Sequence, residues 1–75
     1  MDKYYLTFGW GQKAKINGHL CEPKNGWVEV TADSYEEAES KVRARFGMVW
    51  AVLYAADNFT EKDKRHYPDG CLEVI

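Results

Sequence analysis

The sequence has little of what membrane-spanning, secreted or metal-binding proteins depend on. Its longest apolar run, residues 48–56, is far short of the roughly 20 residues that cross a bilayer. The charged start at residues 1–3 leads into no apolar leader stretch. Only two cysteines are present, which is too few for a disulfide framework, so we expect both to be free thiols. Together these absences predict a cytoplasmic protein.

The charge balance also lacks the basic excess that phosphate binding requires. Ten Lys and Arg residues against twelve Asp and Glu residues give a net charge of −2, which does not indicate a nucleic-acid binder. With 45% hydrophobic and 29% charged residues, the chain is predicted to form one ordered domain over residues 1–75. A chain this short buries only about 60% of its unfolded surface. The 15% aromatic content therefore belongs either to the small core or to a binding surface.

Apolar patterning predicts four strands. Residues 4–8 are aromatic and β-branched and end at a glycine, while residues 27–31 alternate between two faces. Residues 48–55 are apolar on both faces, which predicts a central strand with one face under a helix. A last strand is predicted at residues 71–75, after a Pro-Asp-Gly turn.

One main helix is predicted between the second and third strands. Asp33 or Ser34 can cap its start, with a glutamate three residues later in either case. An apolar stripe runs through to Phe46, and Gly47 is a natural stop. Residues 60–65 carry a second, weaker cap signal and are predicted to form one short helical turn.

A hairpin arm, residues 13–22, is predicted between the first two strands. Its centre is Asn17-Gly18, a dipeptide typical of two-residue hairpin turns. The resulting register pairs Ile16 with His19, Lys15 with Leu20, Ala14 with Cys21 and Lys13 with Glu22. The predicted fold class is therefore α+β: a single small domain with an about four-stranded, mostly antiparallel sheet, one main helix on one face, and this arm.

No motif in the chain predicts catalysis or a bound cofactor. Residues 9–14 fit the pattern Gly-x-Gly-x-x-Ala of dinucleotide sites, but that motif requires a helix to begin at once, and Asn17-Gly18 interrupts the segment. A cysteine–histidine pair is available, yet neither cysteine follows a signal for an activated thiol. We therefore expect a protein that is not an enzyme and that holds no cofactor.

Two histidines and two cysteines together make up a ligand set that zinc can use. They are His19, Cys21, His66 and Cys71. Their spacings differ from those of zinc ribbons and fingers, and small apolar roles for the cysteines with surface histidines explain them better. We expect no metal, and a small zinc-binding domain stays the weakest alternative.

Two groups of charged residues are candidate binding surfaces. Five acids lie within eleven residues, namely Glu29, Asp33, Glu36, Glu37 and Glu39. They are either a solvated helix start or an acidic patch that competes for a basic surface on a partner. The arm carries basic and aromatic residues together, namely Lys13, Lys15 and Lys24 with Trp10, Trp27 and His19. Such a set favours contact with a protein or with a single nucleic-acid strand.

Three segments give the chain a resemblance. They are residues 4–12 (YYLTFGWGQ), 26–38 (GWVEVTADSYEEA) and 45–51 (RFGMVWA), the last followed by Tyr54. This pattern resembles a family of small phage and prophage proteins of uncharacterised function. The chain departs from that pattern between Gln12 and Gly26, where it carries the arm.

The resemblance implies a phage-encoded accessory protein that acts in the host cytoplasm. Our leading hypothesis is a non-enzymatic protein that binds and inhibits a host protein, such as a bacterial defence complex, in the manner of anti-CRISPR proteins. The alternative is a nucleic-acid-binding module that uses the arm. The residues expected to make contact are Trp10, Lys13, Lys15, His19, Trp27, Glu29, Asp33, Glu36 and Glu37. A monomer and a dimer are both compatible with the sequence.

Overall fold

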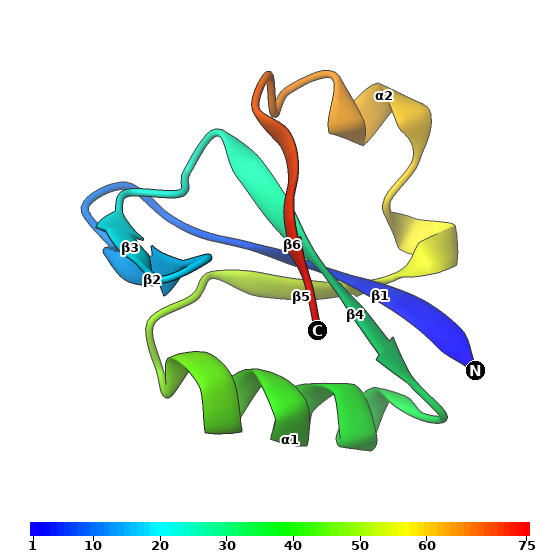
Figure 1. The fold of residues 1–75 in the computed structure, drawn as a ribbon. Helices are drawn as coiled ribbons and strands as arrows, with labels where there is room; N and C mark the ends of the chain where they lie inside the picture. Colours follow the sequence, from blue (N-terminus) through cyan, green and yellow to red (C-terminus); the bar gives the residue numbers. More distant parts are fainter.

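The chain folds into a four-stranded sheet with a long helix on one face and a two-stranded hairpin at one end (Figure 1). The computed structural model describes residues Met1 to Ile75. The elements in chain order are β1 (Asp2–Thr7), β2 (Ala14–Ile16), β3 (His19–Cys21), β4 (Gly26–Ala32), α1 (Tyr35–Phe46), β5 (Val52–Ala55), the 3-10 helix η1 (Ala56–Asn58), α2 (Glu61–Lys64) and β6 (Gly70–Val74). The predicted α+β fold class is confirmed.

The sheet has the strand order β5-β1-β4-β6. β1 pairs antiparallel with both β4 and β5, whereas β6 runs parallel to β4. The sheet is therefore mostly antiparallel, as predicted, with one parallel pair at its edge.

The position of the third strand differs from the prediction. The apolar run 48–55 is predicted to be a central strand, but only Val52–Ala55 forms a strand and β5 lies at the sheet edge. Its residues are apolar on both faces because Leu53 packs in the core under the helix while Tyr54 packs against Phe59 on the opposite face. Met48, in the same run, lies in a loop and is 77% exposed.

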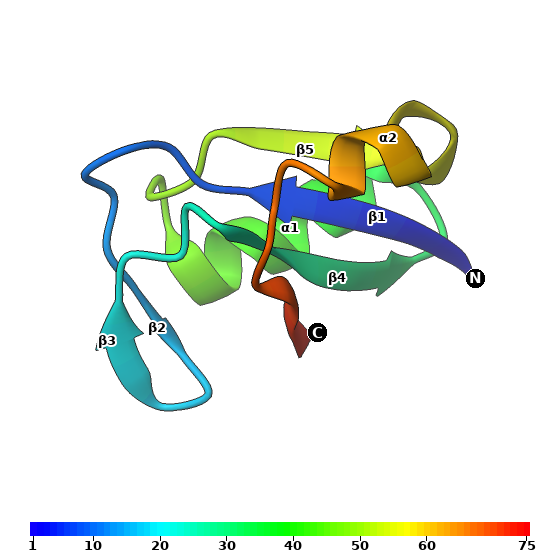
Figure 2. The ribbon, with the colours of Figure 1, turned by 90° about the horizontal axis from the view of Figure 1, so that it is seen from above.

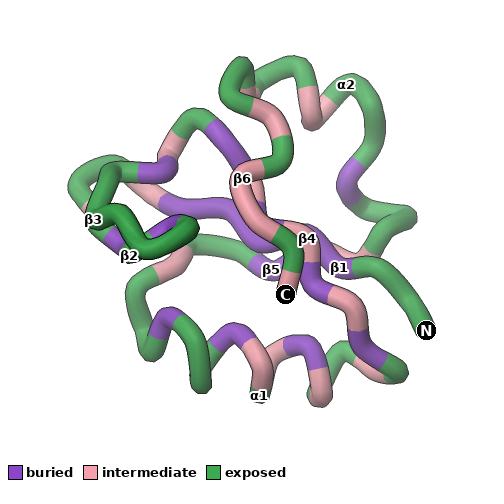
Figure 3. Tube along the Cα trace, viewed as in Figure 1, coloured by how far each residue is buried: buried purple, intermediate pink, exposed green.

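The helix α1 begins and ends where the sequence predicts. The Ser34 hydroxyl caps its start by accepting a hydrogen bond from the Glu37 N–H at 3.1 Å. At the other end, Gly47 takes a φ of 65°, and its N–H donates to the Arg43 carbonyl. Between these caps Ala38, Val42 and Phe46 of the predicted stripe are buried against the sheet. Tyr35, also predicted to belong to the stripe, is 43% exposed, and its hydroxyl donates to the Leu53 carbonyl. Figure 3 shows the buried residues along β1, β4 and one side of α1.

The hairpin of the arm forms in the predicted register. Ala14, Lys15 and Ile16 pair with Cys21, Leu20 and His19, in that order. Asn17 and Gly18 both have positive φ angles, 51° and 83°, as the turn type requires. The further pairing of Lys13 with Glu22 is not formed, because the ladder ends at Ala14 and Cys21 and Glu22 instead lies 3.7 Å from Lys24.

The arm is joined to the domain at its base and at its tip. Ala14 and Ile16 are each 7% exposed and belong to the main core. The Asn17 side-chain amide donates a hydrogen bond to the Leu72 carbonyl of β6 at 3.0 Å. Figure 2 shows the hairpin projecting from the end of the sheet at which β1 finishes and β4 begins. The arm is therefore a fixed part of the surface.

A second, all-aromatic core covers the sheet face opposite α1. Phe59, in the segment between η1 and α2, is 3% exposed, and four aromatic rings surround it. Tyr5 stacks on it at 5.1 Å between ring centroids, and Tyr54, Trp27 and Tyr67 lie at 5.3, 5.6 and 5.7 Å. We call these five residues the Phe59 cluster. It accounts for three of the rings that a one-helix core leaves unexplained, namely Tyr5, Trp27 and Tyr67.

β4 and β6 approach each other too closely for a side chain at Gly26. A Cβ atom there would lie 2.5 Å from Leu72 Cγ and 2.8 Å from the Gly70 carbonyl oxygen. The glycine is therefore required by the close approach of the parallel pair.

The Phe59 cluster predicts a large stability loss on truncation. Phe59→Ala should lower the free energy of unfolding by about 3–5 kcal/mol, because the ring is fully enclosed and four aromatic contacts disappear with it. Trp10→Ala is the matched control: its ring is 86% exposed, so we expect a change within about 0.5 kcal/mol. Urea denaturation followed by circular dichroism measures both. A loss below about 1 kcal/mol for Phe59→Ala would contradict a second core.

Gly26→Ala should destabilise the domain by about 1–3 kcal/mol, because the new methyl group meets Leu72 and the Gly70 backbone. Gly9→Ala serves as control, since a Cβ at Gly9 meets its nearest neighbour at 3.5 Å and no strain is expected. Thermal melts of the two variants make the comparison. Equal melting temperatures would show that β4 and β6 can separate at no cost.

Candidate functional site

The arm surface is the more exposed of the two candidate binding surfaces. We define it by Trp10, Lys13, Lys15, Leu20 and Lys24, all of which lie in or beside the arm. His19 is also exposed, but it pairs with the buried Ile16 and therefore lies on the face of the hairpin opposite to Lys15 and Leu20. The loop that presents Trp10 is held by Gln12, whose side chain accepts from the Gly9 N–H at 2.7 Å and donates to the Trp50 carbonyl at 3.2 Å. Trp10 thus lies on a loop with defined anchors.

Trp10 is the most unusual residue of this surface. Its ring is 86% exposed, and the Lys24 ammonium lies 3.9 Å from the ring centroid. Lys24 in turn lies 3.7 Å from the Glu22 carboxylate. The Gly11 N–H, which donates to Glu22 at 2.9 Å, is the main cause that lowers the pKa of this carboxyl, and Lys24 adds to it. Glu22 and Lys24 together fix the surroundings of the indole.

Leu20 adds a second exposed apolar residue to the arm surface. It is 66% exposed on β3 and pairs with Lys15 in the hairpin, so the two side chains share the outward face. Sequence reasoning placed Leu20 opposite Lys15 but did not name it as a contact residue. Its position in the predicted register, opposite a lysine, was the available signal.

A groove lies beside Trp10. It has a volume of about 350 Å³, and its lining residues are Phe8, Trp10, Lys24, Asn25, His66 and Tyr67. They come from three loops that are far apart in sequence: the one after β1, the one before β4 and the one before β6. Sequence reasoning missed Asn25, His66 and Tyr67 as groove residues, because no local pattern brings these loops together.

Trp27 lies outside the arm surface, in the Phe59 cluster. It is half-buried on β4 and packs edge-on against Phe59 and Tyr67. Tyr67 also lines the groove, so Trp27 packs against one of the groove residues without lining the groove itself.

The five acids between residues 29 and 39, which we call the acidic run, do not form one continuous surface. Val28 and Val30 face α1, so Glu29 between them points to the opposite face, where Lys3 lies 3.8 Å away. Glu37 lies 3.8 Å from Lys41 and accepts from the Asp33 N–H. Asp33 and Glu36 are left as the exposed acids at the helix start.

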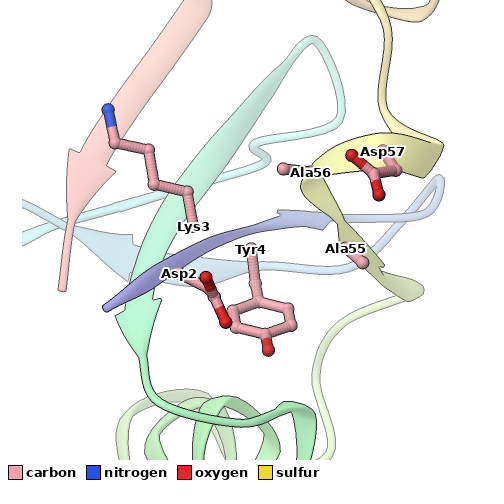
Figure 4. A pocket seen from close by; sticks show the side chains of 6 residues that line it. All are labelled: Asp2, Lys3, Tyr4, Ala55, Ala56 and Asp57. Atoms are coloured by element: carbon pink, nitrogen blue, oxygen red, sulfur yellow. The ribbon is translucent and has the colours of Figure 1, made fainter.

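An acidic corner surrounds Tyr4 at the end of the molecule away from the arm. We define it by Asp2, Asp33, Glu36, Glu37 and Asp57. Burial is the largest cause that raises the pKa of the Tyr4 hydroxyl, followed by the charges of Asp2, Glu36, Asp33 and Glu37. A hollow of about 260 Å³ lies beside it. Figure 4 shows two of the lining acids, with Asp2 next to the Tyr4 ring and Asp57 farther away on η1.

The zinc candidates do not assemble. No group of three or more His, Cys, Asp or Glu side chains lies close enough together to hold a metal ion. Cys21 and Cys71 are both exposed free thiols. None of the helices has the length and apolar character needed to cross a membrane.

No family model matches the chain, and comparison with curated proteins and with solved structures found no significant match. The resemblance to small phage proteins stays a prediction from the sequence.

The acidic corner predicts an abnormal titration of Tyr4. Its hydroxyl should ionise above the ordinary tyrosine pKa of about 10, because burial and nearby carboxylates disfavour the phenolate. A pKa that is raised on folding stabilises the folded state below the unfolded pKa, and this stability is lost as pH rises through the folded pKa. Ultraviolet difference titration of the wild type against Tyr4→Phe isolates this hydroxyl.

The double variant Asp33→Asn/Glu36→Gln should lower the pKa of Tyr4 toward its ordinary value, whereas Glu61→Gln on α2 should leave it unchanged. If the pKa of Tyr4 is the same in Asp33→Asn/Glu36→Gln as in the wild type, these two acids do not lie close enough to Tyr4 to affect its hydroxyl.

Proposed function

We propose that the protein is a small, non-enzymatic binding protein that attaches through its arm surface to a host protein and blocks it. The observation that carries the proposal is the Trp10 ring, 86% exposed yet positioned by Lys24 and by an anchored loop. An exposed tryptophan adds nothing to the core, and tryptophan is enriched among the residues that dominate protein interfaces.

The composition of the arm surface supports a protein partner. Each of its two exposed apolar residues has a lysine beside it: Lys24 lies over the Trp10 ring, and Lys15 pairs with Leu20. Apolar anchors with a charged rim are the usual anatomy of a transient interface. The one acid beside them, Glu22, already contacts Gly11 and Lys24, so the surface complements a partner that carries negative charge.

A fixed arm lowers the entropic cost of binding. Ala14 at its base and Ile16 beside its turn are buried, and the Asn17 side chain in the turn donates a hydrogen bond to β6. Fewer side chains and loops then need to be ordered when a partner docks. Taken with the resemblance to small phage proteins, these features favour an inhibitor acting in the host cytoplasm, with a bacterial defence complex as its target.

Affinity capture from bacterial lysate tests this function. The wild-type chain should retain one protein partner in stoichiometric amount, and nuclease treatment should leave that partner bound. Trp10→Ala and the pair Lys13→Glu/Lys15→Glu should each lose it, because they remove the anchor and reverse the rim charge. Lys62→Glu/Arg65→Glu, which makes the same charge change beside and within α2, is the matched control and should retain the partner.

A second measurement tests the inhibition. Expression of the wild type in a bacterium with an active defence complex should raise the plating efficiency of a restricted phage, and the Trp10→Ala variant should not. Capture that is identical for all variants, or that yields only nucleic acid, would contradict the proposal.

A further inference from the structure

The groove beside Trp10 has a composition that selects one kind of ligand. Three aromatic residues line it, of which Trp10 and Tyr67 are exposed or half-buried, whereas the Phe8 ring packs in the main core against Phe46. Its polar groups are the Lys24 ammonium, the Asn25 amide and the His66 imidazole, all of which can donate hydrogen bonds. No acid lines it. Its polar groups therefore suit an anionic group, and its aromatic walls an apolar one.

Three acids, Glu22, Asp63 and Asp69, lie beside the groove without lining it. Asp69 is exposed, and its backbone N–H donates to the Asn25 carbonyl at 2.8 Å, whereas Glu22 and Asp63 are engaged within the protein. Glu22 accepts from the Gly11 N–H at 2.9 Å and lies 3.7 Å from Lys24. Asp63, near His66, accepts from both the N–H and the hydroxyl of Thr60, at 2.9 and 3.1 Å, and these bonds lower the pKa of its carboxyl. The positive charge of Lys24 is therefore only partly neutralised. Its one carboxylate partner, Glu22, lies 3.7 Å away, which is longer than a hydrogen bond.

The size of the groove limits the ligand. A volume of about 350 Å³ is at the small end of the range of ligand sites, which is roughly 300–1,000 Å³. It accommodates one or two side chains and not a folded surface. An extended segment of a partner can place an aromatic ring on Trp10 and Tyr67 and a carboxylate at Lys24.

We propose that this groove binds a carboxylate next to an aromatic side chain, as presented by an acidic linear segment of the partner protein. The assignment to a partner segment rests on the function proposed above. A polyphosphate strand fits less well, because the net charge of −2 and the acids Glu22 and Asp63 beside the groove repel a chain of phosphates. A single carboxylate requires a single ammonium, and Lys24 supplies it.

N-acetyl-L-phenylalanine, which joins a ring to a carboxylate, is the test probe. It is titrated into the labelled protein while the indole N–H resonance of Trp10 is followed by NMR. We expect binding with a dissociation constant on the order of 1 mM and a shift of this resonance. The uncharged N-acetyl-L-phenylalanine amide should bind at least severalfold more weakly. Acetyl-glutamyl-phenylalanine amide then distinguishes a side-chain carboxylate from a chain-terminal one.

Two substitutions should change the affinity for the probe in opposite directions. Lys24→Gln should weaken binding about fivefold, because it removes the charged donor from a partly exposed site. Glu22→Gln should strengthen binding about threefold, because it removes the competing carboxylate while its amide oxygen can still accept from Gly11. Lys62→Gln, the same charge change on α2, should leave binding unchanged. The spectrum of each variant also reports whether it is folded.

Several results would overturn the inference. The first is equal binding of the acid and its amide. The second is no shift of the Trp10 resonance at a probe concentration ten times the expected dissociation constant. The third is equal affinity of the wild type, Lys24→Gln and Glu22→Gln for the probe. Salt-sensitive binding of octathymidylate in place of the probe would assign the groove to nucleic acid. The probe titration uses no host protein. Failure of the titration therefore does not contradict the function proposed above, and failure of the capture experiment does not contradict binding of the probe in the groove.

Discussion

The antiparallel pairing of β1 with β4 is the interaction on which the rest of the structure depends. Its register places Leu6 opposite Val28 and Tyr4 opposite Val30 on the face that α1 covers. The same register places Thr7 opposite Trp27 on the other face, where the Phe59 cluster forms. A slip of one residue would move every one of these side chains to the wrong face. The two central strands therefore specify both cores.

Local signals predicted much of this fold because their causes are local. Ser34 and Gly47 bound α1 through caps that involve neighbours within four residues, and Asn17-Gly18 sets the hairpin register by its own backbone angles. The Phe59 cluster was not predicted. Phe59 stands alone among polar residues, so it has no periodicity, and its partners come from four separate segments of the chain. For the same reason the edge position of β5 and the parallel pairing of β6 depend on long-range contacts that no short pattern encodes.

The candidate sites divide in the same way. Trp10, Lys13, Lys15 and His19 are neighbours in the sequence, but the hairpin register places His19 on the face of the buried Ile16 and Lys15 on the opposite face beside Leu20. The acidic run appears continuous in the sequence, yet strand alternation sends Glu29 to the face away from α1, whereas Asp33 and Glu36 remain beside Tyr4. The groove unites three loops, and only the folded chain brings His66 and Tyr67 to Trp10. Residue type indicated where binding chemistry is available, but topology decided which residues share a surface.

The hydrogen bond from Asn17 to Leu72 joins positions 55 residues apart. During synthesis from the N-terminus the hairpin emerges well before β6, so its tip has no carbonyl to bind until the final strand is added. The groove depends on the same late segment, because His66 and Tyr67 precede β6 directly. The proposed binding surface is therefore complete only after the last strand has joined the sheet.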